Sequence, residues 1–233
     1  MSLHPNPSIR RPLASAAVHD ALRAQILGGE LVPGDAVPSE RVLADEFGVN
    51  RHAVREAIKR LQQSGLVAVS QGGATRVLDW QTTGGLELLV DIAPLLEGAE
   101  RWKALRSVAE MRASIGADAA RLCARDAPEE LRAQLPETVA LIDAEDDFEQ
   151  RLLAYELLWL RIVAGSGNLA YRLAFNSLVA ARHGAGVPAE VYAAELVDLE
   201  PVRSLAEAIA AGDEQQAAGW ARALLDLTIA GLA

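Results

Sequence analysis

Apolar residues recur at helical spacing between Asn50 and Gln63. At about 100° per residue they form a single stripe, made of Val54, Ala57, Ile58 and Leu61. The other side carries cations and amides, namely Arg51, His52, Arg55, Lys59 and Gln62. The pattern predicts an amphipathic helix that begins after Asn50, buries the apolar stripe and presents a basic face to solvent.

Two helical segments are predicted before this basic helix. From Ser15, one face of a first helix is apolar and Gly28-Gly29 ends it; that face consists of Val18, Leu22, Ile26 and Leu27. Ser39 is placed to cap a short second helix, and Asn50 to cap the basic helix. Gly48 lies between them and favours a sharp turn, as in a helix-turn-helix. The second helix has an apolar face of Val42, Leu43 and Phe47.

A two-stranded hairpin is predicted directly after the basic helix. Gly65 ends the helix, Leu66–Val69 and Ala74–Leu78 read as strands, and Gln71–Gly73 is the turn between them. A hairpin in this position is the wing of a winged helix-turn-helix, and its tip can reach the DNA backbone or minor groove. We therefore predict a DNA-binding domain over residues 15–78.

The basic helix carries the side chains that reading DNA requires. Arginine can bond bidentately to guanine, and Asn or Gln can pair with adenine. The helix N-terminus also offers free N–H groups to a phosphate. An ordinary amphipathic helix with a solvated basic face is the alternative, and the helix alone would not decide between them. The helix before it and the hairpin after it favour DNA binding.

The rest of the chain shows only helical patterns. They cover 85–98, 100–125, 128–141, 145–165, 168–183, 189–211 and 213–231. We predict a mainly α protein, in which a flexible arm (1–14) and the winged helix-turn-helix domain are followed by a linker (79–83) and an all-α helical bundle (84–233).

The charge of −10 is unevenly distributed. Residues 1–80 hold 9 basic and 8 acidic residues, a net of +1, and residues 81–233 hold 13 and 24, a net of −11. A weakly basic module can bind DNA when its cations lie on one face, so the total charge neither supports nor excludes DNA binding. The acidic excess belongs to the predicted bundle.

The composition and motifs indicate a cytoplasmic protein that is not an enzyme. One cysteine, Cys123, excludes an intramolecular disulfide framework, and we expect it to be a small buried residue. The sequence has no secretory signal pattern and no apolar stretch long enough to span a bilayer. We find no nucleotide-binding fingerprint, and no Ser or Cys with a plausible His partner.

The stretch from Val18 to Val77 resembles the DNA-binding domain of the GntR family of bacterial transcription regulators. The resemblance is carried by ILGGELVPGDAVPSERVLADEFGVNRHAVREAIKRLQQSGLV and the QGG at the wing tip. It implies a homodimer that binds a palindromic double-stranded operator. The residues it assigns to the DNA are Arg41, Asn50, Arg51, His52, Arg55, Gln71 and Gly72. Position 50 is often Thr or Ser in relatives, so Asn50 implies a changed phosphate contact or sequence preference.

GGLELL after the wing and SGN at 166–168 resemble the FadR branch of that family. Many members hold a divalent metal through an Asp and a His one helical turn apart and two further His. Counted from SGN and from the Gly212 region, those places fall near Tyr155, Trp159, Val202 and Leu224. Because none is a ligand of the required kind, we expect no metal and no cofactor.

A small organic effector, such as an acyl thioester or an organic acid, is therefore the expected ligand of the bundle. The candidate binding residues are aromatic, amide and cationic side chains: Arg112, Tyr155, Trp159, Arg172, Asn176 and Tyr192. Two alternatives stay open. The bundle could only dimerise, or it could be a helical enzyme or sensor joined to a degenerate DNA-binding module.

Overall fold

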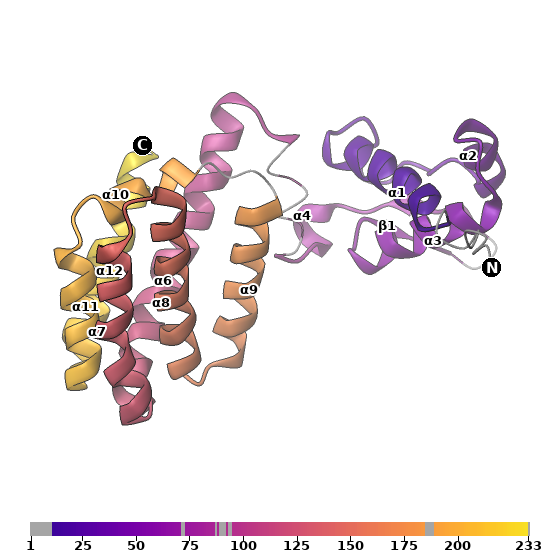
Figure 1. The fold of residues 1–233 in the computed structure, drawn as a ribbon. Helices are drawn as coiled ribbons and strands as arrows, with labels where there is room; N and C mark the ends of the chain where they lie inside the picture. Colours follow the sequence, from indigo (N-terminus) through magenta and orange to yellow (C-terminus); the bar gives the residue numbers. More distant parts are fainter. Residues whose placement is uncertain are drawn as a thin grey trace, which may run out of the picture. The chain divides into compact units, whose positions relative to one another are not determined.

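The computed structural model describes residues 11–70, 73–86, 88, 92, 95–184 and 189–232. The chain divides into two compact units, Met1–Leu95 and Leu96–Ala233. Within the described ranges, both strands belong to the first unit and all elements of the second are helices (Figure 1). The prediction of a mainly α fold with an N-terminal winged helix-turn-helix and a helical bundle is confirmed.

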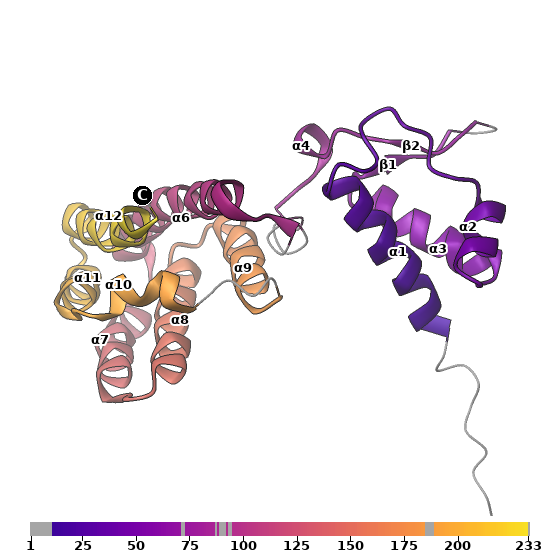
Figure 2. The ribbon, with the colours of Figure 1, turned by 90° about the horizontal axis from the view of Figure 1, so that it is seen from above.

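The first unit is built on a short helical core with a hairpin beside it (Figure 2). Its helices are α1 (Arg11–Leu27), α2 (Glu40–Glu46), α3 (Arg51–Gln63) and α4 (Trp80–Thr83). Helix α1 packs against α3, and Val18, Leu22 and Leu61 are almost fully buried between them. Two details differ from the prediction. Helix α1 begins at Arg11, inside the predicted arm, and α4 occupies most of the predicted linker.

The helix-turn-helix is fixed by the two caps that the sequence predicts. The Ser39 hydroxyl accepts a hydrogen bond from the Val42 N–H at 3.4 Å, and the Asn50 side chain accepts one from the Ala53 N–H at 2.9 Å. Between the helices Gly48 has φ +62°, a conformation that favours glycine. One expectation is wrong: Val42 is exposed, and α2 instead buries Leu43 and Ala44.

The wing is an antiparallel pair of short strands, β1 (Val67–Ala68) and β2 (Arg76–Val77). Val67 lies opposite Val77, and both side chains are buried in the core of the unit. An additional bridge joins Ala36 to Arg76, so the segment before α2 also pairs with the wing. The predicted wing tip, Gln71 and Gly72, lies outside the described residues.

The second unit is a bundle of long helices that lie side by side (Figures 1 and 2). Its elements are α6 (Gly98–Asp126), α7 (Glu129–Ala144), α8 (Phe148–Gly165), α9 (Leu169–Gly184), η3 (Ala189–Tyr192), α10 (Ala193–Leu196), α11 (Glu200–Ala211) and α12 (Glu214–Gly231). The helix predicted over 85–98 lies partly outside the described residues, since positions 87, 89–91, 93 and 94 are not described, and α6 begins at Gly98.

Small residues allow α6 and α12 to pack closely. The buried face of α6 is made of Ala109, Ala113, Gly116, Ala119, Ala120, Cys123 and Ala124. A Cβ atom at Gly116 would lie 2.4 Å from Leu225 of α12, so no larger residue fits there without displacing that side chain. The alanine-rich composition therefore serves helix packing as well as helix propensity.

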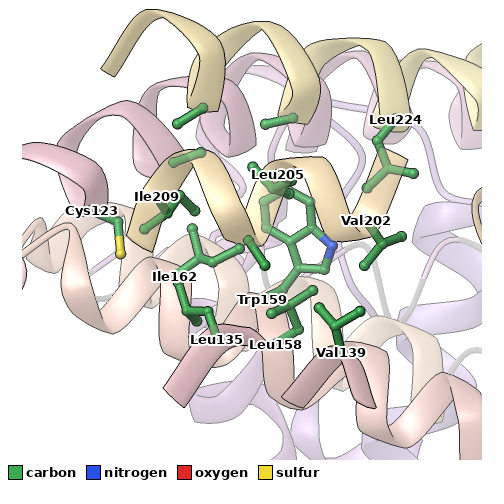
Figure 3. Packing of buried hydrophobic residues seen from close by; sticks show 14 of the residues in the cluster. Cys123, Leu135, Val139, Leu158, Trp159, Ile162, Val202, Leu205, Ile209 and Leu224 are labelled. Atoms are coloured by element: carbon green, nitrogen blue, oxygen red, sulfur yellow. The ribbon is translucent and has the colours of Figure 1, made fainter. Parts of the chain in front are cut away.

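The core of the bundle lies where α8, α11 and α12 meet α6 and α7. In Figure 3 the indole of Trp159 stands among Val202, Leu205 and Leu224, with Cys123 further along the same core. Burial raises the pKa of the Cys123 thiol to about 12, so the thiol stays protonated at neutral pH. The expectation that Cys123 is a small buried residue is confirmed.

The single helix predicted over 189–211 is divided into η3, α10 and α11. Asp198 accepts a hydrogen bond from the Glu200 N–H at 2.9 Å, and Pro201 occupies the first turn of α11. Proline fits a first turn because its missing N–H would have no helical partner there. The interruption gives α10 its own direction and brings Glu195 into the interior of the bundle, where its side chain is 0% exposed.

Candidate DNA-reading face and ligand cavity

The outer face of α3 is the surface predicted to meet DNA. Arg51, His52 and Arg55 are exposed, whereas the apolar stripe on the other side is buried. The side-chain oxygen of Asn50, Oδ1, accepts the capping hydrogen bond. The NH₂ group of the same side chain is therefore left as a donor at the start of the helix. Cations and an amide donor therefore lie together at the N-terminal half of an anchored helix.

Arg55 is held by a carboxylate from the neighbouring helix. Its Nε and Nη2 donate to the two oxygens of Glu40, at 3.0 and 2.7 Å. The hydrogen bond from Arg55 lowers the pKa of Glu40 below its usual value. The pair remains accessible, because the side chains of Arg55 and Glu40 are 57% and 35% exposed. Glu40 was not among the residues predicted from the sequence.

The other predicted DNA contacts have simpler surroundings. Arg41 lies on the exposed face of α2, with Asp45 one turn further at 3.5 Å. Arg76, a wing residue that was not among the predicted contacts, donates to the Gly34 carbonyl at 2.7 Å and so ties the hairpin to the segment before α2. Gln71 and Gly72 lie outside the described residues, and their predicted contact with DNA stays a prediction.

The bundle contains a cavity bounded by α6, α8, α9, α12 and the end of η3. The volume open to a water-sized molecule is about 70 Å³, and the wider empty space, which includes open solvent, is about 670 Å³. The aliphatic and phenyl lining is made of Ile115, Leu152, Val163, Phe175, Leu178, Val179 and Leu225. Four predicted effector residues also line it: Arg112, Tyr155, Trp159 and Tyr192.

Two predicted effector residues do not line this cavity. The Arg172 guanidinium lies 3.5 Å from the Leu160 carbonyl, at the α8–α9 connection. Asn176 lines a separate groove between α8 and α9. Both lie on α9. Arg172 is on the same face as Phe175 and Val179 but nearer the start of the helix, and Asn176 faces the groove, which shares Phe175 and Val179 with the cavity lining.

A buried carboxylate lies behind Arg112 and Tyr155, two polar side chains that line the cavity. Glu195 accepts from Arg112 Nη1 and Nη2 at 2.5 and 2.6 Å and from the Tyr155 hydroxyl at 2.6 Å. The Thr228 hydroxyl also bonds to it. Burial opposes the charge on Arg112, but the Glu195 carboxylate more than offsets this and raises the pKa of Arg112. Burial and the Glu195 charge together raise the pKa of Tyr155.

A second ion pair lies at another edge of the cavity. Arg182 of α9 bonds to Glu156 of α8, and their side chains are only 12% and 21% exposed. The guanidinium of Arg112 also lies over the Tyr192 ring, 4.9 Å from its centre, where a cation is attracted to the aromatic face. Sequence reasoning missed Glu156, Arg182, Glu195 and Thr228 as part of this site.

The places expected to correspond to a family metal site do not fit a metal. Trp159, Val202 and Leu224 offer no ligand atoms and pack against one another in the core, and the Tyr155 hydroxyl is committed to Glu195 (Figure 3). Among the described residues, no cluster of three or more His, Cys, Asp or Glu side chains could hold a metal ion. The donor set therefore lacks the neutral imidazoles and free carboxylate that such a site requires.

None of the helices in the described part of the chain is long and apolar enough to cross a membrane. Family comparison places "Bacterial regulatory proteins, gntR family" over residues 14–77 and "FCD domain" over residues 107–227. The two matches correspond to the helix-turn-helix unit and to the bundle that holds the cavity.

Whole-chain relatives agree with these matches. The chain is 34% identical to the HTH-type transcriptional regulator Mce2R of Mycobacterium tuberculosis, over 97% of this chain and 93% of that protein. It is 32% identical to the fatty acid metabolism regulator protein of Serratia proteamaculans, over 63% of this chain and 59% of that protein. The solved structure of Lar, described as controlling expression of the Listeria monocytogenes agr system, has the same fold (TM-score 0.52, 21% identity, 92% and 94% of the two chains).

Proposed function

The chain belongs to the GntR family of bacterial regulatory proteins and carries an FCD domain, and on this premise we propose how it regulates transcription. Residues 15–78 bind operator DNA, 79–83 are the linker, and 84–233 bind the effector and dimerise. The observation that carries the DNA-binding part is the exposed cationic face of α3, anchored by a capped N-terminus.

Arg51 and Arg55 read base edges in the major groove. Arg41 contacts a phosphate, and so does the side-chain NH₂ group of Asn50. His52 lies beside them, and Gln71-Gly72 contact DNA from the wing tip. Arg55 comes to the DNA already oriented by Glu40, whose two oxygens fix the plane of the guanidinium. A fixed plane favours bidentate bonding to guanine, since less side-chain entropy is lost on binding.

Two copies of the chain form a homodimer that reads a palindromic site. One recognition helix covers only a few base pairs, and a two-fold axis doubles the contacts and the discrimination. The protein acts in the cytoplasm, where bacterial operators are accessible, and releases its effector chemically unchanged. A small apolar organic effector in the α6–α8–α9–α12 cavity controls operator affinity.

The DNA-binding proposal is tested by selecting bound sequences from a random duplex library and measuring affinity by fluorescence anisotropy. Arg51→Ala should lower affinity for the selected site by roughly 10- to 100-fold and lower affinity for unrelated DNA much less. Arg60→Ala is the matched control. It removes the same charge from the same helix, but its side chain points about 180° around the helix axis from that of Arg51. Equal losses in the two variants, or unchanged specificity, would contradict the proposal.

The effector proposal is tested by thermal shift against a metabolite panel, because a ligand that binds only the folded state raises the melting temperature. A hit should also change operator affinity. Leu178→Trp fills the cavity from α9 without touching either ion pair, so it should keep DNA binding and lose the response to the hit. If no metabolite shifts the wild-type protein, the bundle serves dimerisation alone.

A further inference from the structure

Every charged side chain that lines the cavity is already paired within the chain. Arg112 holds Glu195 through two hydrogen bonds, and Arg182 holds Glu156. Among the described residues, the charged side chains of the lining and Glu195 behind them are therefore two cations and two carboxylates, with no net charge to offer a ligand. Arginine in a pocket usually suggests an anionic ligand, so this pairing changes the expected chemistry.

An anionic ligand would have to compete with Glu195 for Arg112. Glu195 has 0% exposed side-chain area, and its contacts come from three long helices, through Arg112, Tyr155 and Thr228. Losing Arg112 would leave this carboxylate buried without its counter-charge, which is strongly unfavourable. Leaving the pair intact would place the ligand anion close to Glu195, where like charges repel in a poorly hydrated space.

An uncharged oxygen has no such conflict. Arginine has five N–H donors, and the bidentate contact with Glu195 uses two of them. Arg112 lines the cavity and its side chain keeps 17% exposure. A carbonyl, ester or hydroxyl oxygen can therefore accept a hydrogen bond from Arg112 while Glu195 stays in place. The remaining lining is mostly aliphatic and aromatic, which suits a hydrocarbon body.

We propose that the effector is an uncharged, largely apolar molecule with one oxygen acceptor directed at Arg112, and that Glu195 excludes carboxylates. This inference rests on the proposed function, in which the cavity is the effector site. It narrows the effector from organic molecules in general to neutral esters, ketones, lactones or alcohols.

Two probes with the same ten-carbon chain test this choice: methyl decanoate and decanoate. Binding is measured below their micelle-forming concentrations at pH 8, where a free carboxylic acid is ionised. The readouts are intrinsic tryptophan fluorescence, to which Trp159 in the cavity contributes, and equilibrium dialysis. Methyl decanoate should bind at least tenfold more tightly than decanoate. The opposite order overturns the inference, and so does binding by neither probe.

The variant Glu195→Gln tests whether Glu195 is the residue that excludes carboxylates. The amide preserves the shape of the side chain, but it keeps only one acceptor oxygen for Arg112 and removes the charge that neutralises Arg112. Decanoate should gain at least tenfold in affinity, while methyl decanoate should change less than threefold. Glu130→Gln, an exposed carboxylate on α7 outside the cavity, is the matched control and should change neither. A decanoate affinity unchanged in folded Glu195→Gln overturns the role of Glu195.

The fold of the Glu195→Gln variant is checked by circular dichroism. If the variant does not fold, the relative affinity of the wild-type protein for methyl decanoate and decanoate decides. Different outcomes test the proposed function and this inference. A metabolite that binds the cavity and releases DNA but is anionic overturns this inference and supports the regulator. A cavity that binds methyl decanoate supports the inference, even when operator affinity does not respond.

Discussion

The two units of this protein each contain an arginine held bidentately by a glutamate, in opposite surroundings. In the DNA-binding unit, Arg55 and Glu40 stand in solvent, with more than half of the arginine side chain exposed. In the bundle, Arg112 and Glu195 make a similar fork at 2.5 and 2.6 Å, but the glutamate is completely buried.

The difference decides what each pair can do. Water and ions can replace either partner of the exposed pair, so Arg55 can exchange part of its bonding with Glu40 for a base at little cost. Nothing replaces a partner of the buried pair, so Arg112 is committed to Glu195. The same residue chemistry therefore gives two different results. Arg55 is an exposed donor that can exchange its partner, whereas Arg112 and Glu195 form a fixed pair without net charge beside the cavity.

The largest expected effect of breaking either pair comes from Glu195→Ala. It should lower the free energy of unfolding of the bundle by about 3–5 kcal/mol, because a buried cation loses its partner. Urea unfolding followed by circular dichroism measures this. The double variant Arg112→Met with Glu195→Met should recover most of the loss, because two apolar side chains leave no buried charge. A loss below about 1 kcal/mol in the single variant would show that water reaches the pair.

The next effect is on DNA specificity. Arg55→Ala should reduce the ratio of specific to non-specific affinity by roughly 10- to 100-fold, the cost of one bidentate base contact. The melting temperature should hardly change, since the side chain is exposed. Anisotropy titrations with the selected operator and a scrambled duplex give both affinities. A uniform loss on both duplexes would assign Arg55 to a phosphate rather than to a base.

Glu40→Gln should have a smaller and divided effect. It removes a negative charge close to the DNA, so non-specific affinity should rise a few-fold and become more dependent on salt. Specificity should fall a few-fold, because Arg55 loses its charged anchor. Asp45→Asn is the control, since it removes a similar charge from the same helix beside Arg41 instead. Identical behaviour of the two variants would mean that only charge matters, and not the orientation of Arg55.

The smallest expected effect is that of metal removal. Protein purified without chelator should contain no stoichiometric zinc, nickel or manganese, and EDTA should not shift its melting temperature. The reason is that Trp159, Val202 and Leu224 occupy the expected ligand places with apolar groups. One bound equivalent by elemental analysis would mean that the ligands lie elsewhere in the chain.

The DNA-binding unit could largely be predicted because its determinants are local. The caps at Ser39 and Asn50 act on N–H groups three residues later, and the α3 stripe repeats within one helix. What sequence reasoning missed there is longer in range. The bridge from Ala36 to Arg76 and the contact from Arg55 to Glu40 join residues far apart in the chain.

The cavity was predicted only in part, for the same physical reason. The helices of the bundle follow from apolar periodicity, but Glu195 is separated from Arg112 by 83 positions and from Tyr155 by 40. A glutamate among apolar residues reads as a surface position until its partners are known. Asp198 and Pro201 are a local signal for the break after α10. The prediction of one helix over 189–211 did not use it.

The packing of α6 against α12 has a consequence for synthesis of the protein on the ribosome. The N-terminal unit has its own core and is complete within the first 95 residues, so we expect it to fold while the rest is being made. The bundle cannot fold until its last helices are synthesised. Arg112 has no counter-charge before Glu195 is made, and the alanine face of α6 stays exposed before α12 is made. A chain that terminates early would thus leave a folded N-terminal unit attached to an aggregation-prone remainder, without the bundle through which we propose that two copies pair.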